Sequence, residues 1–344
     1  MRVLVAMSGG VDSSVAAAVL AGEGHDVVGA TMKLWGGQSD TGCCSVGDVE
    51  DARWVARQLG IDHHVFNFSS DFDRHVVGPY VGEHLAGRTP NPCVECNRHI
   101  KFDRLMVRAA QLGFDAVATG HHARVRRRRG RWELLRGADP AKDQSYVLAM
   151  IGQAQLSRLL LPVGEMTKPQ VRALGAEMGL RTAAKPDSQD VCFVGRPNAR
   201  GRFLSERAPL HPGRLVDAAT GEDAGAVEAL ELLTVGQRRG IGPGPDGRRR
   251  YVLAVDPAAG AALVGGLDHL MVDEVRVGRF SWVDGPVPIG AEVDLQASAH
   301  GATVAAVMES PGRLRLAQPV RRVAPGQTVA LYDGDRVLGS AVAA

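Results

Sequence analysis

Residues 3–20 read VLVAMSGGVDSSVAAAVL, and this stretch decides the fold of the first part of the chain. Its apolar residues 3–7 predict a buried strand, and the alanine- and valine-rich run from Ser14 predicts a helix. Between them, Gly9 and Gly10 let the backbone approach a ligand closely, and serine hydroxyls with the N–H groups of a helix N-terminus favour an anion. The stretch therefore predicts a strand, a phosphate-binding loop and a helix, although an ordinary glycine- and serine-rich turn has the same composition.

The loop lacks the lysine of the commonest nucleotide-binding motif. A Walker A loop requires Gly-Lys followed by Ser or Thr, and Gly-Lys occurs nowhere in this chain. A P-loop kinase or GTPase is therefore excluded. Residues 8–13 instead resemble the SGGxDS signature of the ATP pyrophosphatases, the PP-loop family, whose members release pyrophosphate from ATP and transfer AMP to a substrate oxygen so that this oxygen can leave.

The composition bounds the number of domains and the class of partner. A chain of 344 residues is long enough for two or three domains with cores of their own. A net charge of +2 argues against a uniformly basic nucleic-acid binder, although balanced totals can conceal a basic face. Only five of the 40 basic residues are lysines, and all five lie within the first 185 positions. A lysine retained in such an arginine-rich chain marks either a site that needs a compact ammonium or an ordinary surface position.

The cysteines and the chain start indicate the compartment. Five cysteines in a chain of this length do not form a disulfide scaffold, and their odd number leaves one thiol over. They are Cys43, Cys44, Cys93, Cys96 and Cys192. The first residues run straight into the predicted strand without a signal peptide, and no apolar run approaches ~18 residues. We therefore expect a cytoplasmic protein with no membrane partner, whose reduced thiols are available for chemistry.

Strands and amphipathic helices alternate over the first 122 residues. Strands are predicted at residues 3–7, 27–33, 64–68 and 116–120, and helices at residues 13–22, 49–59, 72–85 and 100–112. This alternation is typical of an α/β fold with a doubly wound parallel sheet, in which ligands bind at the carboxyl ends of the strands. The phosphate-binding loop, residues 32–33 and residues 120–122 should therefore share one pocket.

The rest of the chain predicts smaller units. Residues 122–137 are typical of a hairpin with a tight Arg-Gly turn, and helices are predicted over residues 145–151 and from Thr167, which has capping-box spacing to Gln170. From about residue 197, glycine, proline and short β-type runs dominate. We expect a nucleotide-binding domain over residues 1–197, a small central linker domain over residues 198–270 and an all-β, barrel-like domain over residues 271–344.

Residues 91–97, NPCVECN, place two thiols ahead of a helix predicted to begin near Ile100. The positive end of that helix, together with Arg98 and Lys101, favours the thiolate of Cys96. Cys96 is therefore a candidate nucleophile.

Metal binding is the alternative for these thiols. Cys-x-x-Cys is half of a zinc site, and Cys93, Cys96 and Cys192 together have the ligands for an iron–sulfur cluster with one iron position open. Cys192 itself lies in a polar turn, residues 187–193, which argues against its burial as a small hydrophobe.

Seven short motifs, in this order, resemble those of the tRNA-specific 2-thiouridylases over nearly the whole chain. They are residues 8–13, 89–97 (TPNPCVECN), 119–121 (TGH), 142–146 (KDQSY), 188–193 (SQDVCF), 234–240 (TVGQRRG) and 325–327 (PGQ). The resemblance implies a PP-loop fold of the adenine nucleotide alpha hydrolase type. It also implies a reaction in which the C2 oxygen of the wobble uridine in the tRNA anticodon is adenylated and replaced by sulfur, releasing AMP and pyrophosphate.

The resemblance also implies roles for individual residues. Cys192 would carry a persulfide received from a cysteine desulfurase or a sulfur-relay protein, and Cys96 would attack it as the nucleophile. The two thiols would otherwise end as a Cys96–Cys192 disulfide that needs an external reductant. ATP with Mg²⁺ would be the only cofactor, with no resident metal and the iron–sulfur cluster as the alternative.

The implied contacts fall into three groups. The residues expected to contact ATP are Ala6, Met7, Ser8, Gly9, Gly10, Val11, Asp12, Ser13, Met32 and Gly120. The residues expected to contact the target base are Asn91, Pro92 and Cys93. The residues expected to contact the rest of the tRNA are Lys142, Asp143 and Gln144. Some family members have Asp at the position of Cys93, which leaves an acid–base role there open. Residues 296–300, QASAH, differ from the Arg-Tyr pair that members often carry near the C-terminus, and no site is assigned there.

Other interpretations stay open at this stage. The six arginines of residues 124–131 are either a solvated hairpin tip or a phosphate contact. The chain as a whole is alternatively another PP-loop adenylating enzyme, such as an amidotransferase-type synthetase or a different tRNA thiolase. A catalytically inactive tRNA-binding homologue is the non-enzymatic alternative.

Overall fold

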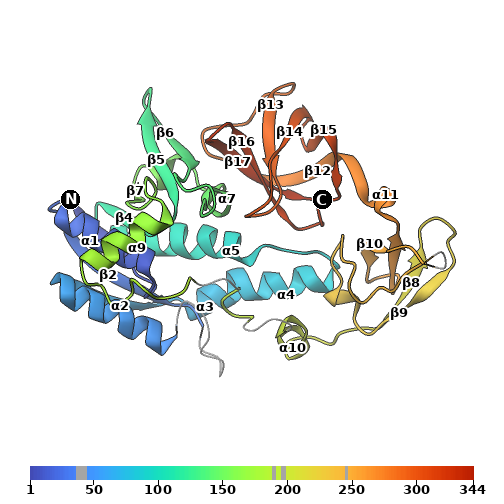
Figure 1. Cartoon of the computed structure of the whole chain (residues 1–344), viewed down its shortest axis with the longest axis horizontal. Helices are drawn as coiled ribbons and strands as arrows, with labels where there is room; N and C mark the ends of the chain where they lie inside the picture. Colours follow the sequence, from blue (N-terminus) through green and yellow to red (C-terminus); the bar gives the residue numbers. More distant parts are fainter. Residues whose placement is uncertain (36–44, 188–190, 195–198, 245–246) are drawn as a thin grey trace.

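The computed structural model describes residues 1–35, 45–187, 191–194, 199–244 and 247–344. Figure 1 shows three parts: an α/β part that contains the N-terminus, a small sheet at the opposite end, and a barrel that contains the C-terminus. Of the described helices, none is long and apolar enough to cross a membrane.

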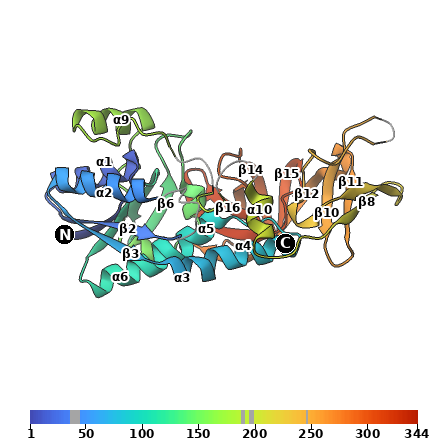
Figure 2. The ribbon, with the colours of Figure 1, turned by 90° about the horizontal axis from the view of Figure 1, so that it is seen from below.

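The α/β part contains the predicted parallel sheet. Its strands, in the spatial order β3-β2-β1-β4-β7, are Asp62–Asn67, Asp26–Lys33, Arg2–Ala6, Ala116–Thr119 and Leu159–Leu160. Figure 2 shows helices α1 (Val11–Gly22), α2 (Val46–Leu59) and α9 (Lys168–Glu177) on one side of this sheet and α6 (Leu105–Gln111) on the other. The doubly wound fold is thereby confirmed.

Alternate residues of β1 build the two cores of this part. Val3 and Val5 pack with α1 and α2 in one buried cluster, whereas Leu4 packs with Leu105 and Ala109 of α6 in another. All of these side chains are completely or almost completely buried, as the continuous apolar run of a two-sided strand requires. Strand β1 therefore holds the loop that follows it rigidly in the middle of the sheet.

The helix after Asn91 begins earlier than predicted. It runs through α5 (Pro92–Glu95), the wider helical segment η2 (Cys96–Arg104) and α6, rather than starting near Ile100. The Asn91 side chain caps it by accepting hydrogen bonds from the N–H groups of Cys93 and Val94, 3.1 and 3.3 Å away, and Pro92 suits the first turn. Cys96 is therefore inside the helix and not ahead of it as predicted, whereas Cys93 lies in the first turn.

Smaller differences have similar local causes. Helix α2 begins at Val46 instead of residue 49 because Ser45 accepts a hydrogen bond from the N–H of Asp48. The predicted helix over residues 72–85 begins at Ser69 and comprises α3 (Ser69–Phe72), η1 (Asp73–Val77) and α4 (Gly78–Leu85). Helix α7 (Ser145–Leu148) ends three residues earlier than predicted, and α8 (Gln153–Leu156) begins after Gly152, which is extended.

The C-terminal part is a closed barrel of six antiparallel strands. In spatial order they are β12 (Met271–Trp282), β15 (Arg313–Arg321), β14 (Val304–Ser310), β13 (Glu292–Gln296), β16 (Thr328–Asp333) and β17 (Arg336–Ala343). Pairing between β12 and β17 closes the barrel around a core that includes Leu314, Val329 and Leu331. This confirms the predicted barrel-like domain.

The predicted hairpin is present as β5 (Ala123–Arg128) and β6 (Arg131–Arg136), with the turn at Arg129 and Gly130. Its place in the fold was not predicted: it extends the barrel's sheet, because Leu135 pairs with Arg336 of β17. The hairpin therefore ties the α/β part to the barrel.

A four-stranded sheet forms the remaining part. Its order is β10 (Tyr251–Asp256), β11 (Ala261–Gly265), β8 (Gly213–Asp217) and β9 (Asp223–Val227). Short helical segments flank it at α10 (Ala199–Ser205), η3 (Leu230–Leu232) and α11 (Leu267–Leu270). The domain boundary predicted after residue 197 lies outside the described residues.

Candidate active site

A cavity of about 640 Å³ opens at the carboxyl ends of β1, β2 and β4. The phosphate-binding loop, Met32 and residues 120–122 all line it, so the predicted sharing of one pocket is confirmed, although Lys33 lies outside the lining. Nine of the ten residues expected to contact ATP line this cavity: Ala6, Met7, Ser8, Gly10, Val11, Asp12, Ser13, Met32 and Gly120.

Two glycines around the loop are packed too closely against neighbouring backbone to be replaced by larger residues. Gly9, the tenth expected residue, has a φ of +72°, and a Cβ atom there would lie 2.2 Å from the carbonyl oxygen of Asp48 in α2. A Cβ atom on Gly120 would lie 2.5 Å from the backbone nitrogen of Ser13. Glycine at these positions therefore allows β4, α2 and the start of α1 to approach one another closely.

The start of α1 offers donors to the cavity. Gly10 is the N-cap residue, so no side chain caps the first turn. The hydroxyl of Ser13 lies 3.1 Å from the backbone nitrogen of Ser8 and 3.1 Å from the carbonyl oxygen of Gly10, which fixes the shape of the loop. A helix of this length with an uncapped first turn, lining a cavity, fits an anionic phosphate.

Four of the five lysines in the chain line this cavity: Lys101, Lys142, Lys168 and Lys185. No arginine of the described residues does so. Each lysine comes from a different segment of the α/β part. Of the two interpretations of the retained lysines, this placement supports a site that uses compact ammonium groups.

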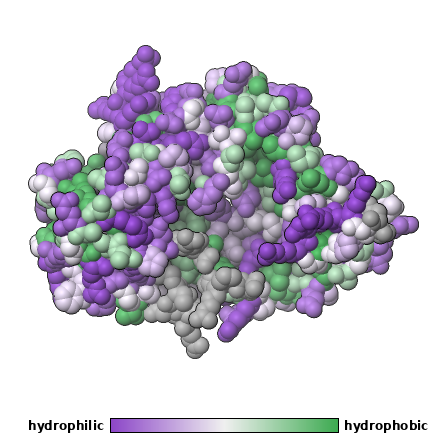
Figure 3. All heavy atoms as spheres, in the orientation of Figure 1, coloured by the Kyte–Doolittle hydropathy of each residue, from purple (hydrophilic) through white to green (hydrophobic). Residues whose placement is uncertain are grey.

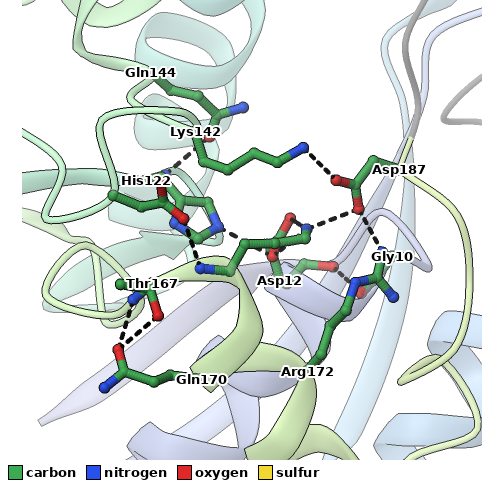
Figure 4. A network of polar contacts seen from close by, with 12 residues as sticks. Gly10, Asp12, His122, Lys142, Gln144, Thr167, Gln170, Arg172 and Asp187 are labelled. Carbon is green, nitrogen blue, oxygen red and sulfur yellow. Dashed lines mark hydrogen bonds and ion pairs between the residues drawn. The ribbon is translucent and has the colours of Figure 1, made fainter.

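Lys168, the first residue of α9, connects two carboxylates of the site. Figure 4 shows these carboxylates, Asp12 and Asp187, with Lys142 and His122 around them. Its Nζ lies 2.7 Å from both carboxylate oxygens of Asp12 and 2.8 Å from Oδ1 of Asp187. Nζ of Lys142 binds the other oxygen of Asp187 at 2.8 Å, and Nε2 of His122 lies 3.2 Å from Asp12. The phosphate-binding loop and α9 are thus joined by one charged network.

The network keeps both carboxylates ionised. Burial by itself would raise the pKa of Asp12, but hydrogen bonds from His122 and Lys168 outweigh it, so the pKa lies below its ordinary value. For Asp187, burial is likewise outweighed by hydrogen bonds from Lys142 and Lys168, which lower its pKa to about 2. Both side chains are therefore charged at neutral pH.

Two adjacent histidines line the same wall. His121 is buried, and this burial lowers its pKa well below the ordinary value; its Nδ1 lies 2.7 Å from the hydroxyl oxygen of Thr119. Nδ1 of His122 is buried with no hydrogen-bond partner among the described residues. A buried polar atom of this kind beside a cavity suits a ligand that brings its own donor or acceptor.

The catalytic thiols expected from the sequence lie next to the cavity lining rather than in it. Cys93 is exposed, whereas Cys96 and Cys192 are partly buried and pack against the same cluster, which includes Phe72, Tyr80 and Phe193. Among the described residues, no group of three His, Cys, Asp or Glu side chains is arranged to hold a metal ion. Cys43, Cys44 and residues 188–190 lie outside the described residues.

The three residues expected to contact tRNA near residue 143 differ in their surroundings. Lys142 and Gln144 line the cavity, but the Asp143 side chain is only 8 % exposed. One of its oxygens accepts hydrogen bonds from the N–H groups of Gly137 and Ser145, and the other binds Arg136 at 2.9 Å. The buried Asp143 side chain therefore stabilises the conformation of this loop through these hydrogen bonds. Of the residues expected at the target base, Asn91 is the helix cap and Pro92 is buried.

The barrel also reaches the site. Gln296 binds Arg136 through a hydrogen bond of 3.0 Å, and His300 lines the cavity, although no site was assigned to residues 296–300 from the sequence. Sequence reasoning also missed Lys168, Lys185 and Asp187 as site residues. The scarcity of lysine was the one signal that could have identified the two lysines.

Comparisons with known proteins agree with this architecture. Residues 1–196 match the family model of the tRNA methyl transferase HUP domain, residues 201–266 that of the tRNA methyl transferase PRC-barrel domain, and residues 272–343 that of the aminomethyltransferase beta-barrel domain.

Curated relatives match over the whole length. The chain is 47% identical to the tRNA-specific 2-thiouridylase MnmA of Saccharopolyspora erythraea, covering 100% of this chain and 99% of that protein. It is 48% identical to the protein of the same name from Chloroflexus aggregans, covering 98% and 97%. A solved structure, the U34-tRNA thiolase NcsA from Methanococcus maripaludis with its [4Fe-4S] cluster, is 16% identical, with a TM-score of 0.38 over 59% of this chain and 64% of that one, too distant for any functional argument. On its full-length similarity to the curated relatives, the chain belongs to the tRNA-specific 2-thiouridylase family.

Proposed function

We propose that this protein is a tRNA-uridine 2-sulfurtransferase, which makes 2-thiouridine at the wobble position of tRNA at the expense of ATP. The observation that carries this proposal is the cavity itself: an uncapped helix N-terminus and four lysines converge on it, in a chain that is similar over its full length to proteins named tRNA-specific 2-thiouridylase. Such a site accommodates a triphosphate, but no cysteine of the described residues lines it, which agrees with thiols placed at its border.

Activation is the role of the cavity. The C2 oxygen of the uridine attacks the α-phosphorus of ATP, and pyrophosphate leaves with the electron pair of the broken bond. The donors of α1 and the ammonium of Lys168 face the place where this negative charge develops, so they stabilise it. Asp12, ionised and at the cavity wall, would hold Mg²⁺ together with phosphate oxygens, and this ion would neutralise charge on the leaving pyrophosphate.

Sulfur transfer is the role of the thiols. Cys192 carries the persulfide, and the thiolate of Cys96 attacks the inner sulfur of that persulfide. A Cys96–Cys192 disulfide forms and hydrosulfide leaves; hydrosulfide attacks C2 of the adenylated uridine and expels AMP with the former C2 oxygen. An external dithiol then returns two electrons to the disulfide. The packing of both cysteines against one aromatic cluster supports this pairing.

The sulfur is supplied by a cysteine desulfurase or a sulfur-relay protein acting on Cys192. The direct test incubates the purified protein with ATP, Mg²⁺, unmodified tRNA, L-cysteine, a cysteine desulfurase and a dithiol reductant, followed by mass spectrometry of the tRNA nucleosides. We expect 2-thiouridine that depends on ATP. Asp12→Ala should remove the product while retaining the fold, because the carboxylate that organises the loop is lost.

Two other functions remain distinguishable in the same experiment. An amidotransferase-type synthetase would consume ATP to AMP without any need for Cys96 and Cys192. An inactive tRNA-binding homologue would bind tRNA but release no pyrophosphate. Formation of normal amounts of 2-thiouridine by a folded Asp12→Ala protein would contradict the proposed role of the cavity.

A further inference from the structure

The hairpin β5–β6 projects from the molecule as a separate finger (Figure 1). Its turn, Arg129-Gly130, has φ angles of +49° and +81°, which is the turn geometry that matches the twist of two-residue hairpins. Figure 3 shows hydrophilic side chains covering this projection at the upper left. The finger therefore presents its charged residues to solvent on an ordered two-stranded scaffold.

Only part of the positive charge on this finger is neutralised. Arg124 binds Asp335 at 3.0 Å, Arg126 binds Glu133 at 2.6 Å, and Arg131 binds Asp284. By contrast, the exposed Arg127, Arg128 and Arg129 have no ion pair with any residue that the structure describes. We call these three residues the fingertip arginines.

The pairing of the strands concentrates this charge. Arg128 lies directly opposite Arg131 across the hairpin, and like charges in directly opposed positions destabilise a sheet. Arg127 is opposite Trp132, with its guanidinium 5.8 Å from the ring centre. A bound anion beside Arg128 would offset this repulsion further than the ion pair of Arg131 with Asp284 does.

The position of the finger relative to the active site limits what that anion is. Ala123, the first residue of β5, directly follows His122 of the cavity wall. Six residues of strand span roughly 20 Å, so the tip is more than one nucleotide away from the reacting base. The tip also borders a second cavity, of about 540 Å³, formed with residues 283–288 of the barrel and Trp132. A ligand that reaches both the active-site cavity and the tip of the finger must be an extended polyanion.

We propose that the fingertip arginines bind phosphates of the tRNA backbone at a distance from the uridine being modified. This inference rests on the proposed function, which supplies the extended polyanion. Planar guanidinium groups match the oxygen pairs of phosphates, and such contacts position the nucleic acid without reading its sequence. The finger thus gives affinity and orientation, whereas the cavity supplies the chemistry.

The test compares two triple variants that remove the same charge. One is Arg127→Ala with Arg128→Ala and Arg129→Ala; the matched control is Arg276→Ala with Arg313→Ala and Arg315→Ala, whose arginines are exposed on the barrel and paired with Glu274 and Glu309. The fingertip variant should raise the KM for tRNA by on the order of 10-fold and lower the slope of log affinity against log salt by about 2, as expected for the loss of two to three phosphate contacts. Its kcat at saturating tRNA and its melting temperature should stay at wild-type values.

Three further results decide the inference. Replacing the same three residues by lysine should restore most of the affinity, because charge is kept. An equal rise of KM in the barrel control would contradict the inference, since net charge alone would then explain it. A second contradicting result would be a fingertip variant with an unchanged KM for tRNA that reacts more slowly with a protein persulfide but at the normal rate with free sulfide. The finger would then contact the sulfur donor and not the tRNA. If the wild-type protein makes no 2-thiouridine, the proposed function fails, but direct binding of tRNA to the two variants still decides the role of the finger.

Discussion

The ammonium of Lys168 lies 2.7 Å from both carboxylate oxygens of Asp12, although the two residues are 156 positions apart in the chain. Lys168 begins helix α9 and Asp12 lies in the first turn of α1, so their ion pair fixes two helix N-termini beside the same cavity. Because the Lys168 side chain is only 9 % exposed, water does not replace the contact when it is lost.

Lys168→Met should reduce the rate of pyrophosphate release by on the order of 100-fold, because one positioned charge in an enclosed site contributes that much to stabilising a transition state. Lys33→Met is the matched control: Lys33 is the one lysine outside the cavity lining and is exposed. The rate is measured in single turnovers with saturating ATP and tRNA. Equal rates in the two variants would show that Lys168 has no part in activation.

The charged network should make stability depend on acid pH. The pKa of Asp187 is lowered to about 2 from its ordinary 3.8, so its contribution to the free energy of unfolding is fully present above pH 5 and is lost as pH falls toward 2. The shift corresponds to roughly 2 kcal/mol. Urea unfolding between pH 2 and pH 6 should show the difference between wild type and Asp187→Asn shrinking as the pH falls. A difference that does not change over this range would contradict the role of the ion pairs.

Mass spectrometry should distinguish the roles of the two thiols, Cys96 and Cys192. After treatment with a cysteine desulfurase, Cys96→Ser should carry a persulfide on Cys192 but make no 2-thiouridine, because loading needs only the acceptor thiolate. Cys192→Ser should not load productively, yet should retain slow product formation with high free sulfide. Cys93→Ser serves as the comparison on the same helix. A persulfide found on Cys93, with a fully active Cys192→Ser protein, would reverse these assignments.

The metal content tests the alternative role of the same cysteines. Protein purified without oxygen should be active with no stoichiometric iron or zinc, since no group of three His, Cys, Asp or Glu side chains in the described part of the chain could hold a metal ion. Elemental analysis and activity are measured on the same samples, before and after treatment with a chelator. Activity that rises with bound iron and disappears on chelation would favour the iron–sulfur site.

Local features of the sequence predicted local features of the fold. The glycines and serines after β1 predicted the loop that leads into α1. Thr167 with Gln170 predicted the start of α9, where Gln170 Oε1 lies 2.8 Å from the backbone nitrogen of Thr167. The same kind of signal was overlooked at two other helix starts. Ser45 caps α2, which was predicted to begin at residue 49, and Asn91 followed by Pro92 marks a start that the apolar pattern placed near Ile100.

Contacts between distant segments could not be predicted in this way. Lys168 meets Asp12 only because α9 packs beside α1, which depends on the tertiary fold and not on sequence spacing. The hairpin joins the barrel through the pairing of Leu135 with Arg336, and His300 reaches the cavity as a consequence of that docking. The roles expected of individual site residues therefore stay predictions until the variants above are measured.

The central claim is that the cavity adenylates the C2 oxygen of the uridine before sulfur replaces it. It is tested most directly with a tRNA whose target uridine carries ¹⁸O at C2, incubated with the protein, ATP and a persulfide donor in ordinary water. Since the bond from C2 to this oxygen breaks only when AMP leaves, each 2-thiouridine formed should be accompanied by one AMP that contains ¹⁸O. Unlabelled AMP, or ADP and phosphate in place of AMP and pyrophosphate, would contradict the account.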